Sequence, residues 1–126
     1  MRAPNHHLVR SGTVLAPLEI ASTARARSRG LLGRDRIEGA MLLRPACSVH
    51  SFGMRFDLDV AFLDRDGVVL RTVRLPRNRM TAFVLRSRAV VEAQAGAFAA
   101  WGLAVGDRLS VEQAPGADPR RDAGQT

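Results

Sequence analysis

Three side chains that can bind a ligand or exchange a proton interrupt the most hydrophobic stretch of the sequence: His50, Met54 and Asp59. Imidazoles exchange protons near neutral pH, carboxylates accept hydrogen bonds or meet cations, and thioethers are soft ligands. Packing alone would favour apolar residues here, so we predict that the three lie near one shallow pocket. The simpler interpretation makes His50 a core histidine and pairs Asp59 with an arginine, best Arg71 across a predicted hairpin.

Two arginines are candidate anion contacts for such a pocket, Arg55 and Arg29. Arg55 is too far along its own strand for easy contact with Asp59. Arg29 falls in a predicted short helix over 24–32, where Arg25 projects from the same face one turn earlier. Solvated arginines on an outer face are the simpler interpretation of that pair.

Metal or nucleophilic chemistry finds less support in the sequence. Cys47, His50 and Met54 are side-chain types found in copper sites, but such a site needs a second histidine. His6 and His7 are the remaining histidines, and they lie in a segment expected to be mobile. Cys47 and His50 have opposite parity on any strand, and the single cysteine excludes an intramolecular disulfide. We therefore predict no metal, no cofactor and no catalytic residue.

The elements that must position these residues are mostly strands. Apolar residues alternate with polar ones from His50 to Phe62, which is typical of a half-buried strand. Thirteen residues exceed a usual strand, so we expect a break near 53–57. Asp66 and Gly67 then predict a tight hairpin into a return strand over 68–75.

Further strands are predicted at 13–20, 40–44, 81–85, 88–93 and 109–111, and a second short helix at 96–101. Pro17 marks the first of these strands as an edge or bulged strand. This pattern predicts a mainly β or α+β domain, a small curled antiparallel sheet, barrel-like, with one or two short helices.

With 126 residues, the chain has room for one domain, which we place at 12–113. We expect residues 1–11 to form a flexible arm and 114–126 a disordered tail, because neither shows a hydrophobic period. No stretch is apolar enough for a spanning helix or an export signal, so a cytoplasmic location is expected.

The formal net charge is +7, and all 19 basic residues are arginine. Such a balance is typical of proteins that bind nucleic acid or anionic surfaces. The sequence also lacks lysine and tyrosine and is rich in alanine, a bias that G/C-rich codons would produce by themselves. Nucleic-acid binding would require a contiguous basic face and a stacking surface, and aromatic residues are only 5% of the chain.

Several motifs in order resemble the domain-of-unknown-function family 192, over about residues 13–111. They are Arg29-Gly30-Leu31-Leu32-Gly33-Arg34, His50-Ser51-Phe52-Gly53-Met54-Arg55-Phe56, Leu58-Asp59-Val60-Ala61-Phe62-Leu63-Asp64, Ala95-Gly96, Gly102-Leu103 and Gly106-Asp107. The resemblance implies a small β-rich fold and no particular reaction. Asp57 departs from the family pattern, which usually has proline there. We interpret the following glycines as structural, at turns and close approaches: Gly30, Gly33, Gly67, Gly96, Gly102 and Gly106.

The leading hypothesis from the sequence is a non-enzymatic β domain that binds a small molecule or a partner protein. Arginine-mediated binding of nucleic acid or an anionic surface is the first alternative. An unrecognised metal-dependent or hydrolytic enzyme is the second.

Overall fold

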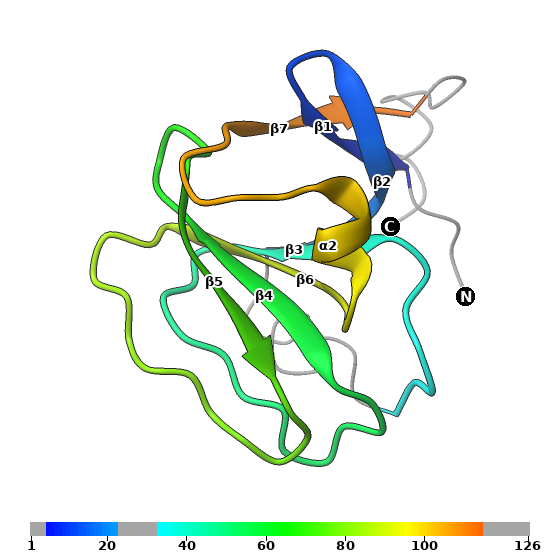
Figure 1. The fold of residues 1–126 in the computed structure, drawn as a ribbon, viewed down its shortest axis with the longest axis vertical. Helices are drawn as coiled ribbons and strands as arrows, with labels where there is room; N and C mark the ends of the chain where they lie inside the picture. The colour runs from blue at the N-terminus through cyan, green and yellow to red at the C-terminus, as the bar shows by residue number, and fades with distance from the viewer. Residues whose placement is uncertain (1–4, 23–32, 115–126) are drawn as a thin grey trace.

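The computed structural model describes residues 5–22 and 33–114, which form one mainly β domain (Figure 1). Seven strands make a mixed sheet in the order β5-β4-β6-β3-β2-β1-β7. The elements are β1 (His6–Arg10), β2 (Thr13–Ala21), β3 (Ala40–Leu43), β4 (Leu58–Leu63), β5 (Val69–Leu75), β6 (Ala89–Gln94), helix α2 (Ala97–Trp101) and β7 (Leu109–Gln113).

Residues 6–10 are part of the sheet, which differs from the arm expected over residues 1–11. Strand β1 pairs antiparallel with β2 on one side and with β7 on the other. Leu8 and Val9 are each only 1% exposed, so the segment contributes to the core. Arg10 donates hydrogen bonds to the carbonyl oxygens of Trp101 (2.8 Å) and Gly102 (3.1 Å). The segment shows no alternation in the sequence because its two apolar residues are adjacent. Adjacent residues of a strand point to opposite faces, and this strand is buried on both.

The sheet is curled but not purely antiparallel, because β2 and β3 run parallel. Strands β5 and β7 are its two edges. These edges meet at one end through an isolated bridge between Val68 and Arg108. The result is an open sheet that bends toward closure, which accounts for the barrel-like pattern in the sequence.

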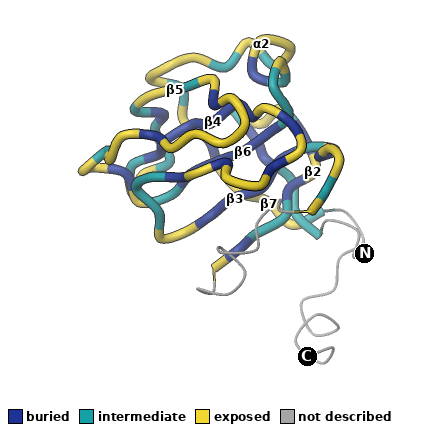
Figure 2. Tube along the Cα trace, turned by 90° about the horizontal axis from the view of Figure 1, so that it is seen from below, coloured by how far each residue is buried: buried dark blue, intermediate teal, exposed yellow. Residues whose placement is uncertain are grey.

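Two hydrophobic clusters pack on the two faces of this sheet. Leu58, Val60 and Phe62 of β4 face one cluster, and Ala61 and Leu63 face the other. All six residues of β4 are buried, as are most residues of β3 and β6, which Figure 2 shows in dark blue at the centre of the tube. The alternation therefore identified the strand, but the expectation of one inward face was wrong, since curling buries both faces.

Two other predicted elements differ from the structure. The segment 44–57 contains no named strand, so β4 begins only at Leu58, after the break expected near 53–57. Residues 81–85, predicted as a strand, form no strand. The Asp66-Gly67 turn joins β4 to β5 as predicted, and α2 occupies the predicted position of the second helix. The first predicted helix, 24–32, lies outside the described residues.

Candidate ligand-binding site

His50 and Met54 follow each other closely in the chain, but they have different environments. His50 is exposed and forms an isolated bridge with Met80. Its ring stacks on Phe52 with centroids 5.2 Å apart, and its Nδ1 accepts a hydrogen bond from the Phe52 N–H at 3.3 Å. Met54 is 9% exposed and belongs to the first hydrophobic cluster. His50 is therefore a surface residue, and the thioether of Met54 is part of the core.

Asp59 is buried and fully engaged. Its Oδ1 accepts a hydrogen bond from Arg74 Nε at 2.7 Å, and its Oδ2 accepts from the N–H groups of Gly96 (2.9 Å) and Phe98 (3.0 Å). The expected partner, Arg71, lies opposite Phe62, because the register places Arg74 across from Asp59. The carboxylate thus joins β4, β5 and the start of α2.

Arg55 is exposed and pairs with Asp35 at 2.9 Å. Arg29 and Gly30 lie outside the described residues. The other glycines interpreted as structural all have positive φ: Gly33, Gly67, Gly96, Gly102 and Gly106. Because Asp59 faces the second cluster's side of β4 and Met54 belongs to the first cluster, the structure does not bring these candidates into a common cavity.

A hollow of about 300 Å³ lies elsewhere, beside the turn between β4 and β5. Its floor is apolar and includes Leu8, Leu42 and Leu63 of the second cluster, with Leu109 from β7. Ser110 also lines it. A second hollow of about 430 Å³ adjoins it and shares four residues with it, Asp64, Arg65, Asp66 and Arg88.

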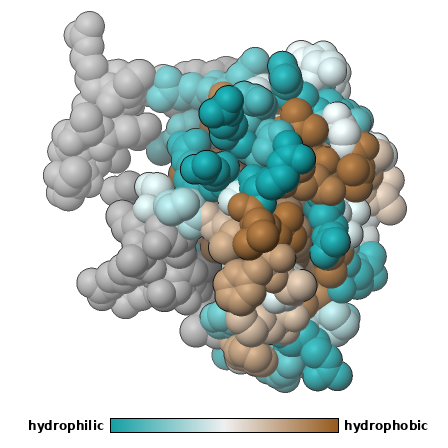
Figure 3. Space-filling view, turned by 90° about the vertical axis from the view of Figure 1, so that its left-hand side faces the viewer, coloured by the Kyte–Doolittle hydropathy of each residue, from teal (hydrophilic) through white to brown (hydrophobic). Residues whose placement is uncertain are grey.

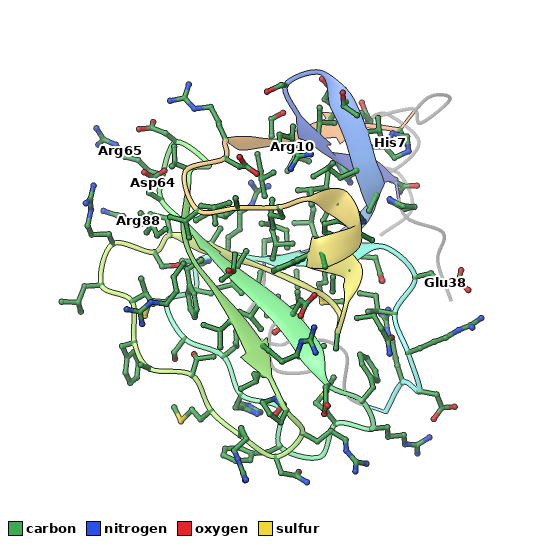
Figure 4. The ribbon with its side chains drawn as sticks, in the orientation of Figure 1. His7, Arg10, Glu38, Asp64, Arg65 and Arg88 are labelled. Atoms are coloured by element: carbon green, nitrogen blue, oxygen red, sulfur yellow. The ribbon has the colours of Figure 1, made fainter. Side chains whose placement is uncertain are left out.

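Arginine side chains line the rim of these hollows. Arg65 and Arg88 border both, Arg44 borders the first and Arg86 borders the second. Figure 4 shows Arg65, Asp64 and Arg88 grouped at one edge of the molecule, where the turn meets the start of β6. Among the described residues, no side-chain hydrogen bond or ion pair engages Arg65, Arg86 or Arg88. Their guanidinium groups are available to an incoming anion.

Two carboxylates lie at this rim, Asp64 and Asp66, and that of Asp64 is already engaged by the turn. Asp64 Oδ1 accepts hydrogen bonds from the N–H groups of Asp66 (2.8 Å) and Val68 (3.0 Å). The Val68 hydrogen bond, the Asp66 hydrogen bond and the positive charges of Arg86 and Arg108 lower the pKa of Asp64. Its negative charge therefore shapes the turn and does not bind Arg65 or Arg88 directly.

Two backbone anchors hold the rim in place. The Leu109 N–H donates to the Gly67 carbonyl oxygen at 2.8 Å, which fastens the turn to β7. Ser87 is 5% exposed, and its hydroxyl oxygen lies 2.8 Å from the Ala46 and 3.0 Å from the Ala89 carbonyl oxygen, which share its one proton. The Arg88 N–H donates to the Leu63 carbonyl oxygen at 2.8 Å, and the Arg88 carbonyl oxygen accepts from the Ala46 N–H at 3.3 Å, so the backbone position of Arg88 is well defined.

The sequence does not predict this site, because each of its parts, a turn and the starts of two strands, is a common element that does not indicate a binding site when taken alone. Asp64–Gly67 was recognised as a turn, and Arg88 as the start of a strand. Nothing in the local pattern indicates that the turn, β6 and β7 converge.

Within the described residues, no three His, Cys, Asp or Glu side chains gather closely enough to hold a metal ion. No helix in this part of the chain is long and apolar enough to cross a membrane.

These features define a class: a small β-rich domain whose open, curled mixed sheet carries an arginine-rimmed hollow. The chain belongs to domain-of-unknown-function family 192 (DUF192), described as an uncharacterized ACR, whose model matches residues 7–111. This confirms the resemblance seen in the motifs. The match also includes β1, in agreement with its place in the sheet.

Two solved structures share the fold. One is a protein of unknown function from Novosphingobium aromaticivorans DSM 12444, 20% identical with a TM-score of 0.71, covering 83% of this chain and 82% of that one. The other is described as a "putative transcription regulator" from Sinorhizobium meliloti 1021, 22% identical with a TM-score of 0.72, covering 88% of this chain and 97% of that one. At these identities the likeness concerns the fold alone. No curated protein matches the chain.

Proposed function

We propose that this domain is a binding module for a small anion that carries an apolar group, held in the hollow between the 64–67 turn, β6 and β7. One observation carries the proposal: Arg65 and Arg88, engaged with no other side chain among the described residues, border a hollow of about 300 Å³ with a leucine floor.

The chemistry of the hollow favours an amphipathic ligand. Guanidinium groups form charge-assisted hydrogen bonds with carboxylates and phosphates, often in pairs. The leucine floor would bury a short alkyl or aromatic group, at about 0.8 kcal/mol per methylene. Neither a purely polar ion nor a neutral hydrocarbon would use both parts of the site.

Isothermal titration of the full chain with three probes tests this: hexanoate, hexanol and inorganic phosphate. We expect saturable binding of hexanoate and clearly weaker binding of the other two. Arg88→Ala and Arg65→Ala should each weaken hexanoate binding about tenfold, corresponding to about 1.4 kcal/mol. Ser110→Phe should block the hollow, because a ring placed at this exposed lining residue occupies the space of the ligand.

Arg71→Ala is the matched control, since Arg71 is an exposed arginine on β5 that lines neither hollow. It removes the same charge and should leave the affinity for hexanoate unchanged. Absence of saturable hexanoate binding, or equal losses in Arg71→Ala and Arg88→Ala, would refute the proposal.

A further inference from the structure

Four large hydrophobic side chains are exposed on two neighbouring loops. Phe52 is 51% exposed, Met80 55%, Phe83 64% and Leu85 92%. They lie in the segments 44–57 and 76–88, which Figure 1 shows looping below and to the left of the sheet. Leu85 also lines the second hollow. We call these four residues the loop patch.

Backbone hydrogen bonds join the two loops into one unit. The Ser51 N–H donates to the Arg79 carbonyl oxygen at 2.8 Å, and the Thr81 N–H donates to that of Val49 at 2.9 Å. Farther along, the Val84 N–H donates to the Cys47 carbonyl oxygen at 2.8 Å. The loop patch is therefore presented by a braced surface.

The patch residues are not exposed because the loops lack side chains that face the core. In the second loop, Thr81 and Ser87 are buried, and Val84 packs against the first hydrophobic cluster. These residues fill the side of the loop that faces the core, while Met80, Phe83 and Leu85 face outward. Folding gains nothing from such outward hydrophobic groups, and clusters of them commonly mark interaction surfaces. Figure 3 shows hydrophobic surface on this side of the molecule, bordered by hydrophilic side chains.

The second of the two loops carries only positive charge. Segment 76–88 contains four arginines, Arg77, Arg79, Arg86 and Arg88, and no acidic residue. Arg77, Arg79 and Arg86 are exposed, and no ion pair engages them among the described residues. In the first loop, Asp57 is already engaged, since its Oδ1 accepts a hydrogen bond from the Arg77 N–H at 2.9 Å. The free charge of the loops therefore favours an occupant that is anionic and also accepts apolar groups.

From this combination we infer that the loop patch docks on an anionic lipid surface. Met80 and Phe83 would enter the boundary between headgroups and acyl chains, while Arg77 and Arg79 contact lipid phosphates. Each arginine near an anionic bilayer contributes about 1 kcal/mol, and side chains such as phenylalanine favour the interfacial region. A bilayer is favoured over nucleic acid because Met80 and Leu85, half of the loop patch, are aliphatic and suit an acyl-chain boundary, whereas only Phe52 and Phe83 could stack on bases.

Sedimentation of the full chain with lipid vesicles tests the inference. Vesicles of phosphatidylcholine mixed with phosphatidylglycerol should bind the protein, and vesicles of phosphatidylcholine alone should bind it much less. High salt should weaken binding, because it screens exposed charges. The double variant Arg77→Ser/Arg79→Ser should lower the partition coefficient about thirtyfold, from about 1 kcal/mol per arginine. The double variant Met80→Ser/Phe83→Ser should lower it at least tenfold at unchanged melting temperature.

Val105→Ser is the matched apolar control, since Val105 is 63% exposed in the turn before β7, outside the loop patch. It should bind vesicles like the natural sequence. Equal binding to both vesicle types, or full binding by Met80→Ser/Phe83→Ser, would overturn the inference. So would sedimentation showing that the patch joins two copies of the chain, or tight binding to a DNA or RNA oligonucleotide in place of vesicles. None of the four substituted residues lines the arginine-rimmed hollow, so this test is separate from the hexanoate titration.

Discussion

Asp59 on strand β4 holds the first turn of helix α2 through the backbone N–H of Phe98, which donates to its Oδ2 at 3.0 Å. The same oxygen accepts from the Gly96 N–H, and the other oxygen pairs with Arg74. The side chain of Asp59 is 7% exposed and that of Arg74 is 57% exposed. The two partners of this ion pair therefore contribute differently to the free energy of unfolding. The Asp59 carboxylate, which the sequence placed near a ligand pocket, therefore serves mainly to join β4, β5 and the start of α2.

Replacing Asp59 should cost much more stability than replacing its partner. Asp59→Ala leaves two N–H groups without their acceptor, and a lost charged hydrogen bond costs about 1–3 kcal/mol. We expect a total loss of about 3 kcal/mol. Arg74→Ala should cost less than about 1 kcal/mol, since the arginine is largely solvated. Urea unfolding of both variants measures this, and equal losses would contradict the assigned role of Asp59.

Ser51 joins the two loops that carry the patch. It is fully buried, and its hydroxyl donates to the Pro76 carbonyl oxygen at 2.5 Å and accepts from the Arg79 N–H at 3.0 Å. Ser51→Ala should lower the free energy of unfolding by about 2 kcal/mol, because buried backbone groups lose a partner. Amide hydrogen exchange should rise first in the 76–81 segment. Unchanged exchange there would show that the hydroxyl does not hold the loops together.

Gly67 is required where the 64–67 turn meets β7. Its φ is +83°, and a Cβ at this position would collide with the carbonyl oxygen of Leu109. Gly106 also has a positive φ, of +95°, but a Cβ there would meet nothing within 4 Å. Gly106→Ala should therefore show only the backbone cost of about 1–2 kcal/mol, and Gly67→Ala clearly more. Thermal unfolding of the two variants compares these costs, and similar melting temperatures would contradict the close approach.

Glu92 should make stability depend on pH. It is 4% exposed between Val60 and Met41 on the neighbouring strands, and burial raises its pKa to about 7 from an ordinary 4.5. Below pH 4.5 the carboxyl is protonated in both the folded and unfolded states. As pH rises toward 7, the unfolded chain loses this proton more readily, so the free energy of unfolding falls, by about 3 kcal/mol in total.

Glu92→Gln should remove that decline, because the amide does not titrate. The stability difference between Glu92→Gln and the natural sequence should therefore grow in favour of glutamine from pH 4.5 to about 7 and then level off. Chemical denaturation across this range measures it. A difference independent of pH would mean that Glu92 keeps its ordinary pKa in the folded protein.

The arrangement of the elements was predictable in part. The β4–β5 hairpin followed from Asp66-Gly67 between two apolar runs, and α2 followed from its flanking glycines, Gly96 and Gly102. These signals are local, so they act before the rest of the chain is in place. Strand β1 was missed, because a short strand buried on both faces shows no alternation.

The family, the mainly β fold and the excess of positive charge were all predictable from the amino-acid sequence, since each depends on residue types and near neighbours along the chain. The roles of the individual side chains followed from the three-dimensional arrangement. The register across β4 and β5 paired Asp59 with Arg74, and the curl of the sheet brought Arg65, Arg88 and Ser110 around one hollow. Contacts between residues distant in the chain depend on how strands pair and bend, and no local pattern contains that information.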